Sequence, residues 1–268
     1  RETLAPKGLD IETVAGRLLG VYEDIIASRE RNKQRRQTAA GITNRPQTEY
    51  GRPVSHPHIK VLLINNCHYR RGGADVVYLN TGDLLESRGH EVAYFSTKSQ
   101  YNYATRYSEY FVRDIDALKL NFVEQLVYMP RKLYSREARR NLGKIIEDFQ
   151  PDLAHIHLYK GGLTAAILPV LRRKRIPAVI TLHDYCLLCP RNIMIDGNGK
   201  ICERCLTATR LNCIYHRCNR KNLYYSIVNY IEFVINNNYF NPGNYFNRII
   251  CVSRFNYLKH GNHPLFRE

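Results

Sequence analysis

The stretch KVLLINNCHYRRGGAD, residues 60–75, indicates how this chain folds. It opens with a short apolar run typical of a buried strand and reaches two glycines at the expected start of a helix over residues 74–88. Gly72 and Gly73 allow backbone N–H groups to approach an anion, aided by the helix dipole and two preceding arginines. The motif is not the G-x-G-x-x-G of dinucleotide-binding proteins, which disfavours NAD. A plain strand-to-helix turn is the alternative interpretation.

The alternation of strand and helix continues toward the C-terminus. Further apolar runs predict strands over residues 91–97, 152–158, 178–183 and 248–253, with helices over residues 132–149, 162–174 and 222–237 between them. Nearly continuous apolar strands that alternate with helices are typical of an α/β fold, with a parallel sheet covered by helices on both faces. Ligands of such sheets bind beyond the carboxyl ends of the strands.

A histidine and an acid occupy one of these strand ends. His183 and Asp184 follow the strand over residues 178–183, which makes His183 a candidate functional residue, although a structural histidine is about as common at such a position. His155 and His157 lie on one face of the preceding strand, at positions i and i+2. We expect core or supporting roles for them, because no third metal ligand is evident.

Six of the eight cysteines lie in one insert over residues 186–218, with the spacing C-x2-C-x12-C-x2-C-x7-C-x4-C. Two C-x2-C pairs around a glycine-containing turn are typical of a structural zinc site, since each pair can place two thiolates on one tetrahedral ion. A catalytic zinc is disfavoured because four thiolates close the coordination shell. Free buried thiols are the alternative, and the spacing leaves open which four of the six would bind metal.

The N-terminal part has a different organisation. Residues 9–28 show an amphipathic helical pattern, with Leu18, Val21 and Ile25 on its apolar stripe. Residues 29–58 are polar, basic and interrupted by prolines, which is typical of a linker. We therefore expect a helix over residues 1–28, a basic linker over residues 29–58 and a new domain from Ile59 onward.

Composition restricts the class of protein and its partners. The 268 residues carry 40 Lys+Arg against 24 Asp+Glu, a formal net charge of +16, which favours anionic partners: nucleic acid, an acidic membrane surface or phosphorylated small molecules. No basic cluster adjoins a helix-turn-helix or heptad pattern, so nucleic acid is disfavoured. There is no secretory signal and no apolar run long enough to span a membrane. We expect a cytoplasmic protein, with peripheral contact at the inner face of the membrane as an open possibility.

Three segments carry a resemblance to a known family: HYRRGGADVVYLNTGDLLESRGHEV, DLAHIHLYKGGLTAAILPVLRRKRIPAVITLHDYCLLCPRN and ICVSRF. Together they resemble the N-terminal, acceptor-side half of family-4 retaining glycosyltransferases of GT-B fold. The resemblance covers residues 59–255 and implies a Rossmann-like domain. The cysteine insert also resembles one in some members, whose recurrent positions correspond to Cys189, Cys202, Cys205 and Cys218; Cys186 and Cys213 fit that pattern less well.

The resemblance implies sugar transfer from a nucleotide-sugar to the hydroxyl of a glycan or lipid-linked acceptor, with retained anomeric configuration and no catalytic metal. Gly72 and Gly73 would then approach the phosphates of the donor, and His183 would act as the catalytic residue that holds the donor sugar near the reacting carbon. Asp75 stands where glutamate is common in the family and receives no role.

The family also has a second, nucleotide-binding domain. This chain ends at Glu268, so residues 256–268 are expected to be only the start of an interdomain segment. The helix over residues 1–28 resembles the tail of a preceding domain. These features predict a fragment of a longer, tandem protein that is inactive or nearly so by itself. The alternatives are a zinc-containing nucleic-acid-binding protein and a non-catalytic module that docks on a membrane surface.

Overall fold

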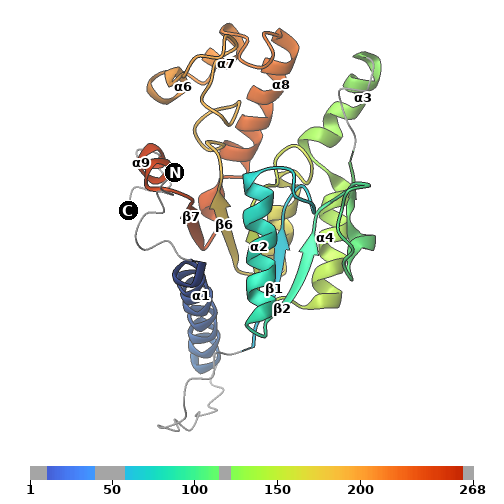
Figure 1. Ribbon diagram of the computed structural model, residues 1–268, viewed down its shortest axis with the longest axis vertical. Helices are drawn as coiled ribbons and strands as arrows, with labels where there is room; N and C mark the ends of the chain where they lie inside the picture. The colour runs from blue at the N-terminus through green and yellow to red at the C-terminus, as the bar shows by residue number, and fades with distance from the viewer. Residues whose placement is uncertain (1–10, 40–57, 115–121, 262–268) are drawn as a thin grey trace, which may run out of the picture.

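The computed structural model describes residues 11–39, 58–114 and 122–261. Its centre is a five-stranded sheet in the order β2-β1-β5-β6-β7, in which every neighbouring pair is parallel (Figure 1). The strands are β1 (Lys60–Ile64), β2 (Glu91–Phe95), β5 (Leu153–Ile156), β6 (Ala178–Leu182) and β7 (Arg248–Cys251). The predicted α/β class with a parallel sheet is therefore confirmed.

Helices cover both faces of this sheet, as predicted. Successive residues of β1 alternate between the faces: Leu62 and Ile64 pack with α4 (Arg136–Phe149) and α5 (Leu168–Arg173), whereas Val61 and Leu63 pack with α1 (Ile11–Ala39) and α2 (Gly73–Ser87). All four of these β1 side chains are fully buried. β1 thus contributes side chains to two hydrophobic cores.

Smaller elements complete the described fold. β3 (Thr97–Lys98) and β4 (Val112–Arg113) form a short parallel pair. The remaining helices are α3 (Phe122–Leu133), α6 (Arg204–Thr207), α7 (Asn212–Tyr215), α8 (Leu223–Val234) and α9 (Arg254–His260). Short 3-10 turns span Ser108–Tyr110, Ala165–Ile167 and Pro242–Asn244, and a π-helical turn spans Ile235–Tyr239. The cysteine-rich segment with α6, α7 and α8 stands above the carboxyl edge of the sheet (Figure 1).

Two predicted helices begin later than expected because polar caps set their starts. The helix predicted over residues 132–149 begins at Arg136, since the Ser135 hydroxyl accepts a hydrogen bond from the Ala138 N–H at 3.1 Å. The helix predicted over residues 162–174 begins with the 3-10 turn at Ala165, where Thr164 is the cap and has a φ of 64°.

The N-terminal helix differs from its prediction in extent. α1 continues to Ala39, so the expected end of the helix at residue 28 is wrong, and the first 11 residues of the expected linker, 29–39, are helical. This extension contains good helix formers and neither glycine nor proline, so it needs no apolar stripe to continue. Residues 1–10 and 40–57, which complete the expected helix and linker, lie outside the described residues, as do residues 262–268 of the expected interdomain segment.

α1 packs against the sheet of the α/β domain. Its most buried side chains among those described are Leu19, Tyr22 and Ile25. Ile25 belongs to the predicted stripe, whereas Leu19 and Tyr22 each lie one position beyond the predicted Leu18 and Val21, which are only partly buried. The Tyr22 hydroxyl lies 2.5 Å from Nδ1 of His155 on β5. α1 therefore contributes to the same core as α2 and the sheet, where a tail of a preceding domain was expected.

If α1 is part of this core, Tyr22→Ala should lower the free energy of unfolding by about 3–5 kcal/mol, the usual cost of removing a buried aromatic ring. Asp24→Ala, on the exposed side of the same helix, should change it by less than about 0.5 kcal/mol. Urea unfolding monitored by circular dichroism measures both values. Equal stability of the two variants would show that α1 does not support the domain.

Candidate functional site

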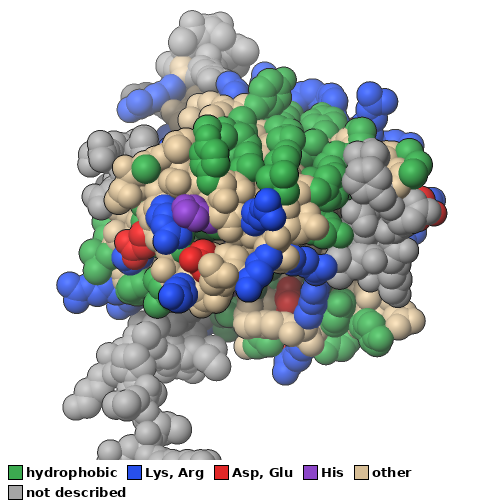
Figure 2. Space-filling view, turned by 90° about the horizontal axis from the view of Figure 1, so that it is seen from above, with side chains coloured by type: hydrophobic (Ala, Val, Ile, Leu, Met, Phe, Trp, Pro, Cys, Tyr) green, Lys and Arg blue, Asp and Glu red, His purple; other side chains and the backbone are tan. Residues whose placement is uncertain are grey.

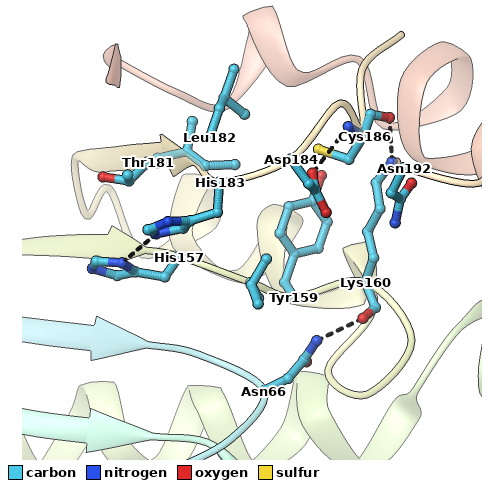
Figure 3. A pocket seen from close by; sticks show the side chains of 12 residues that line it. Asn66, His157, Tyr159, Lys160, Thr181, Leu182, His183, Asp184, Cys186 and Asn192 are labelled. Carbon is cyan, nitrogen blue, oxygen red and sulfur yellow. Dashed lines mark hydrogen bonds between the residues drawn. The ribbon is translucent and has the colours of Figure 1, made fainter. Parts of the chain in front are cut away.

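A pocket of about 150 Å³ opens at the carboxyl edge of the sheet. It lies where the strand order changes direction, between β1 and its neighbour β5, and extends to β6; this is the expected ligand position in open α/β sheets. Its lining comprises Asn66, His157, Leu158, Tyr159, Lys160, Ile180, Thr181, Leu182, His183, Asp184, Cys186 and Asn192 (Figure 3). Of the predicted site residues, His183 lines this pocket, and Gly72 and Gly73 do not.

His183 contacts a second histidine. Its Nε2 lies 2.9 Å from Nδ1 of His157, and the two rings stack with centroids 5.1 Å apart (Figure 3). Burial lowers the pKa of His183 to about 4 and places the pKa of His157 well below its ordinary value. Both rings are therefore neutral at pH 7, and within the pair one nitrogen donates and the other accepts.

The third histidine of this group supports the other two from below the pocket. His155 Nε2 lies 2.7 Å from the Thr181 hydroxyl, and its ring centroid is 4.3 Å from that of His157. Burial, with a smaller contribution from nearby His183, lowers the pKa of His155 to about 3. The expected core or supporting role fits the surroundings of His155, but His157 lines the pocket itself.

Lys160 supplies a cation to the pocket, and sequence reasoning gave it no role. Its ammonium donates to the Cys186 carbonyl oxygen at 2.7 Å and lies 5.6 Å from the centre of the Phe233 ring. Burial raises the pKa of the nearby Glu232 carboxyl, whereas the charges of Lys160 and Lys132 lower it. The available sequence signal was a lysine in the loop that follows a predicted strand, two residues after its predicted end at residue 158.

Two asparagines at the end of β1 hold the surrounding loops. The Asn65 amide N–H₂ donates to the Asp75 carboxylate at 2.7 Å, and its carbonyl accepts the Leu158 N–H at 3.1 Å. The Asn66 amide donates to the Lys160 carbonyl at 2.6 Å (Figure 3). Gly162 packs so closely against Asn66 that a Cβ there would lie 2.8 Å from its Oδ1.

Gly72 and Gly73 lie where β1 passes into α2, and both are exposed. The Asp75 carboxylate accepts the Gly72 N–H at 3.0 Å, so this N–H is already bonded, and Asp75 acts as the capping residue that sequence reasoning left without a role. Neither glycine has a positive φ, and a Cβ at Gly73 would meet nothing within 4 Å. The described protein itself therefore does not require glycine at position 73.

The insert cysteines form one cluster, which we call the thiol cluster: Cys189, Cys202, Cys205, Cys213 and Cys218. Burial raises the pKa of Cys205 to about 12, with further increases from Cys189, Cys218 and Cys202. Burial likewise raises the pKa of Cys213, with Cys218, Cys189 and Cys205 adding to the shift. The four cysteines predicted from the family pattern thus lie together, and Cys213 lies with them.

Cys186 is apart from the thiol cluster. It packs in the hydrophobic core beside the pocket, where its backbone N–H donates to Asp184 at 3.0 Å. All eight cysteines are free thiols. Across the described ranges, no three His, Cys, Asp or Glu side chains are arranged to hold a metal ion, so the zinc assignment stays a prediction.

The face that contains the carboxyl edge carries many Lys and Arg side chains and few acidic ones, with hydrophobic side chains between them (Figure 2). Such a surface attracts anionic ligands. No helix within residues 11–39, 58–114 and 122–261 is both long and apolar enough to cross a membrane.

Comparison with known proteins places this site in a family context. The model of Glycosyltransferase Family 4 matches residues 71–256, a range that includes His157, His183 and the thiol cluster. α1 and β1 precede the matched range. None of the curated proteins matches the chain.

The buried histidines predict a loss of stability in acid. Their pKa values in the folded protein lie below the ordinary 6.5, so below pH 6.5 the unfolded chain binds more protons than the folded one. The contribution to stability is therefore complete above pH 6.5 and is lost as the pH falls from 6.5 toward the folded pKa values. Each fully buried histidine, His155 and His157, should cost about 1.4 kcal/mol per pH unit over this window. Urea unfolding at pH 7.5 and pH 5 measures the difference.

As a check on the cause, His155→Gln removes one of the buried rings and should make this pH profile less steep. Equal unfolding free energies of the unmodified protein at the two pH values would contradict the neutral, buried state of the histidines.

Proposed function

Since the chain belongs to glycosyltransferase family 4, we propose that its carboxyl-edge pocket is the acceptor side of a sugar-transfer site. The donor would be a nucleotide-sugar, and the acceptor a hydroxyl of a glycan or lipid-linked molecule, with retention at the anomeric carbon and no catalytic metal. The observation that carries the proposal is the pocket at the change of strand direction, lined by the neutral His183 and the cationic Lys160.

In this proposal His183 holds the donor sugar by a hydrogen bond beside the reacting carbon. A neutral imidazole can do this without bringing a second positive charge near the oxocarbenium-like centre. Lys160 offers a cation on the same side of the pocket, suited to a phosphate group of the donor or of a lipid-linked acceptor.

Gly73 supports donor phosphate binding. Neither the backbone conformation nor the neighbouring side chains require glycine at this position. A glycine is then expected if a ligand must approach the main chain closely. The start of α2, with its dipole and preceding arginines, suits a diphosphate. We assign the nucleotide itself to a second domain, and expect residues 59–255 alone to bind ligand with little or no turnover.

The test for the phosphate site is Gly73→Ala. The methyl group should hinder the approach of a phosphate and weaken the binding of inorganic pyrophosphate by about tenfold, the effect of losing roughly 1.5 kcal/mol of charged hydrogen bonding. NMR titration measures the binding. Gly143→Ala, on the open surface of α4, is the matched control and should bind as the unmodified protein does. Equal weakening by both variants, or by neither, argues against the site.

The test for transfer uses the full-length protein. His183→Ala should lose most of the hydrolysis or transfer from a nucleotide-sugar, because the sugar is no longer held at the reacting carbon. Chromatographic detection of the released nucleotide measures the rate. Normal turnover by the variant would remove His183 from the reaction.

We also propose that the thiol cluster binds one structural zinc ion, with ligands drawn from Cys189, Cys202, Cys205 and Cys218. Support comes from the convergence of these thiols and from their spacing. Elemental analysis of the purified protein should find one zinc per chain, lost in Cys205→Ser and retained in Cys251→Ser, whose thiol lies in β7. Metal-free protein would end the proposal, and equal zinc in both variants would remove Cys205 from the ligand set.

A further inference from the structure

We infer that His157 is a positioning residue, which sets the tautomer of His183 so that this ring presents an Nδ1–H donor to an oxygen atom of the bound substrate. The identity of that substrate rests on the proposed function, whereas the state of the two rings does not.

The hydrogen bond between the histidines restricts their protons. Nδ1 of His157 and Nε2 of His183 are 2.9 Å apart, and two neutral rings can share this contact only if exactly one of these nitrogens carries hydrogen. Fixing the proton on one ring therefore fixes it on the other. The question is which of two arrangements the surroundings favour.

The far nitrogen of His157 distinguishes the two arrangements. Its Nε2 is buried and has no hydrogen-bond partner. If His183 donated through Nε2, the neutral His157 would carry its hydrogen on this isolated Nε2, leaving a buried N–H unsatisfied. Orphaned buried N–H groups are rarer than under-satisfied acceptors. We therefore place the hydrogen of His157 on Nδ1, from which it donates to Nε2 of His183.

The ring of His157 has little freedom to adopt another arrangement. Its backbone N–H donates to the Ile64 carbonyl at 2.8 Å, which fixes the position of the residue after β5. The ring lies between His155, with centroids 4.3 Å apart, and Tyr78, with centroids 5.6 Å apart and nearly perpendicular planes. His157 is 2% exposed, so water cannot readily replace its bond to His183.

The tautomer of His183 determines which kind of substrate atom its Nδ1 can bond. With Nε2 occupied as an acceptor, the neutral ring carries its hydrogen on Nδ1, for which no partner exists within the described chain. This nitrogen can donate to a sugar hydroxyl or phosphate oxygen, but it cannot take a proton from an acceptor hydroxyl. His183 thus holds an oxygen atom of the substrate and does not act as a general base through Nδ1.

The experiment is ¹⁵N NMR of the whole chain, labelled at histidine, at pH 7.5, with the His183 signals identified by their loss in His183→Asn. The unmodified protein should show a protonated Nδ1 and an unprotonated Nε2 at His183. His157→Leu removes the donor and should shift His183 toward the Nε2–H form, whereas His157→Asn, which can retain a donor near the position of Nδ1, should restore the first pattern.

His155→Gln is the matched control, since His155 is equally buried but contacts Thr181 and Tyr22. It should leave the His183 tautomer unchanged. An Nε2-protonated His183 in the unmodified protein would overturn the inference even if the variants fail to fold, and an unchanged tautomer in a folded His157→Leu variant would do the same.

Turnover by the full-length protein separates this inference from the proposed function. His157→Leu should lower kcat/KM for a nucleotide-sugar by about tenfold or more, and His157→Asn should recover most of it. If the NMR pattern is as stated but no nucleotide-sugar is turned over, the proposed function fails and the inference stands. If turnover occurs with His183 protonated on Nε2, the inference fails and the proposed function stands.

Discussion

The carboxyl edge of the sheet depends on the amide groups of Asn65 and Asn66. The two residues follow β1, and their side chains satisfy backbone groups of loops that are far away in sequence, at Leu158, Lys160 and Leu163. Buried backbone polar groups need partners, and loops that leave a sheet have lost their strand neighbours. The asparagines replace these neighbours, so the pocket lining, the start of α2 and the loop after β5 are held in one arrangement.

Burial also determines the charge at this edge, because it keeps the pocket histidines neutral although the protein as a whole is strongly basic. The chain has a formal net charge of +16, yet His155, His157 and His183 are all held neutral by desolvation. Attraction of an anion then falls to Lys160 and to the surrounding arginines and lysines (Figure 2). The histidines are left to provide directional hydrogen bonds, whose geometry depends on the pairing of β5 with β6.

The sheet could be predicted from the sequence because each buried strand is a short apolar run. One edge of the pocket could be predicted because His183 follows such a run. The roles of Asn65, Asn66 and Lys160 could not, since their partners depend on strand order and lie up to 97 residues away. The extension of α1 to Ala39 was missed because residues 29–39 are polar and basic and have no apolar period. Cysteine spacing left open which four of the six insert thiols gather. The position of Cys213 beside the other thiols and the separation of Cys186 from them follow from packing.

The packing of α1 changes where this fold can be divided. Leu19, Tyr22 and Ile25 cover one face of the sheet, and the Tyr22 hydroxyl reaches the histidine group beneath the pocket. α1 therefore belongs to the same folded unit as the pocket, even though it precedes the family-matched range. An exchange of this domain between proteins should cut the gene before Ile11, because a cut at residue 71 would remove both α1 and the strand β1 that pairs β2 with β5.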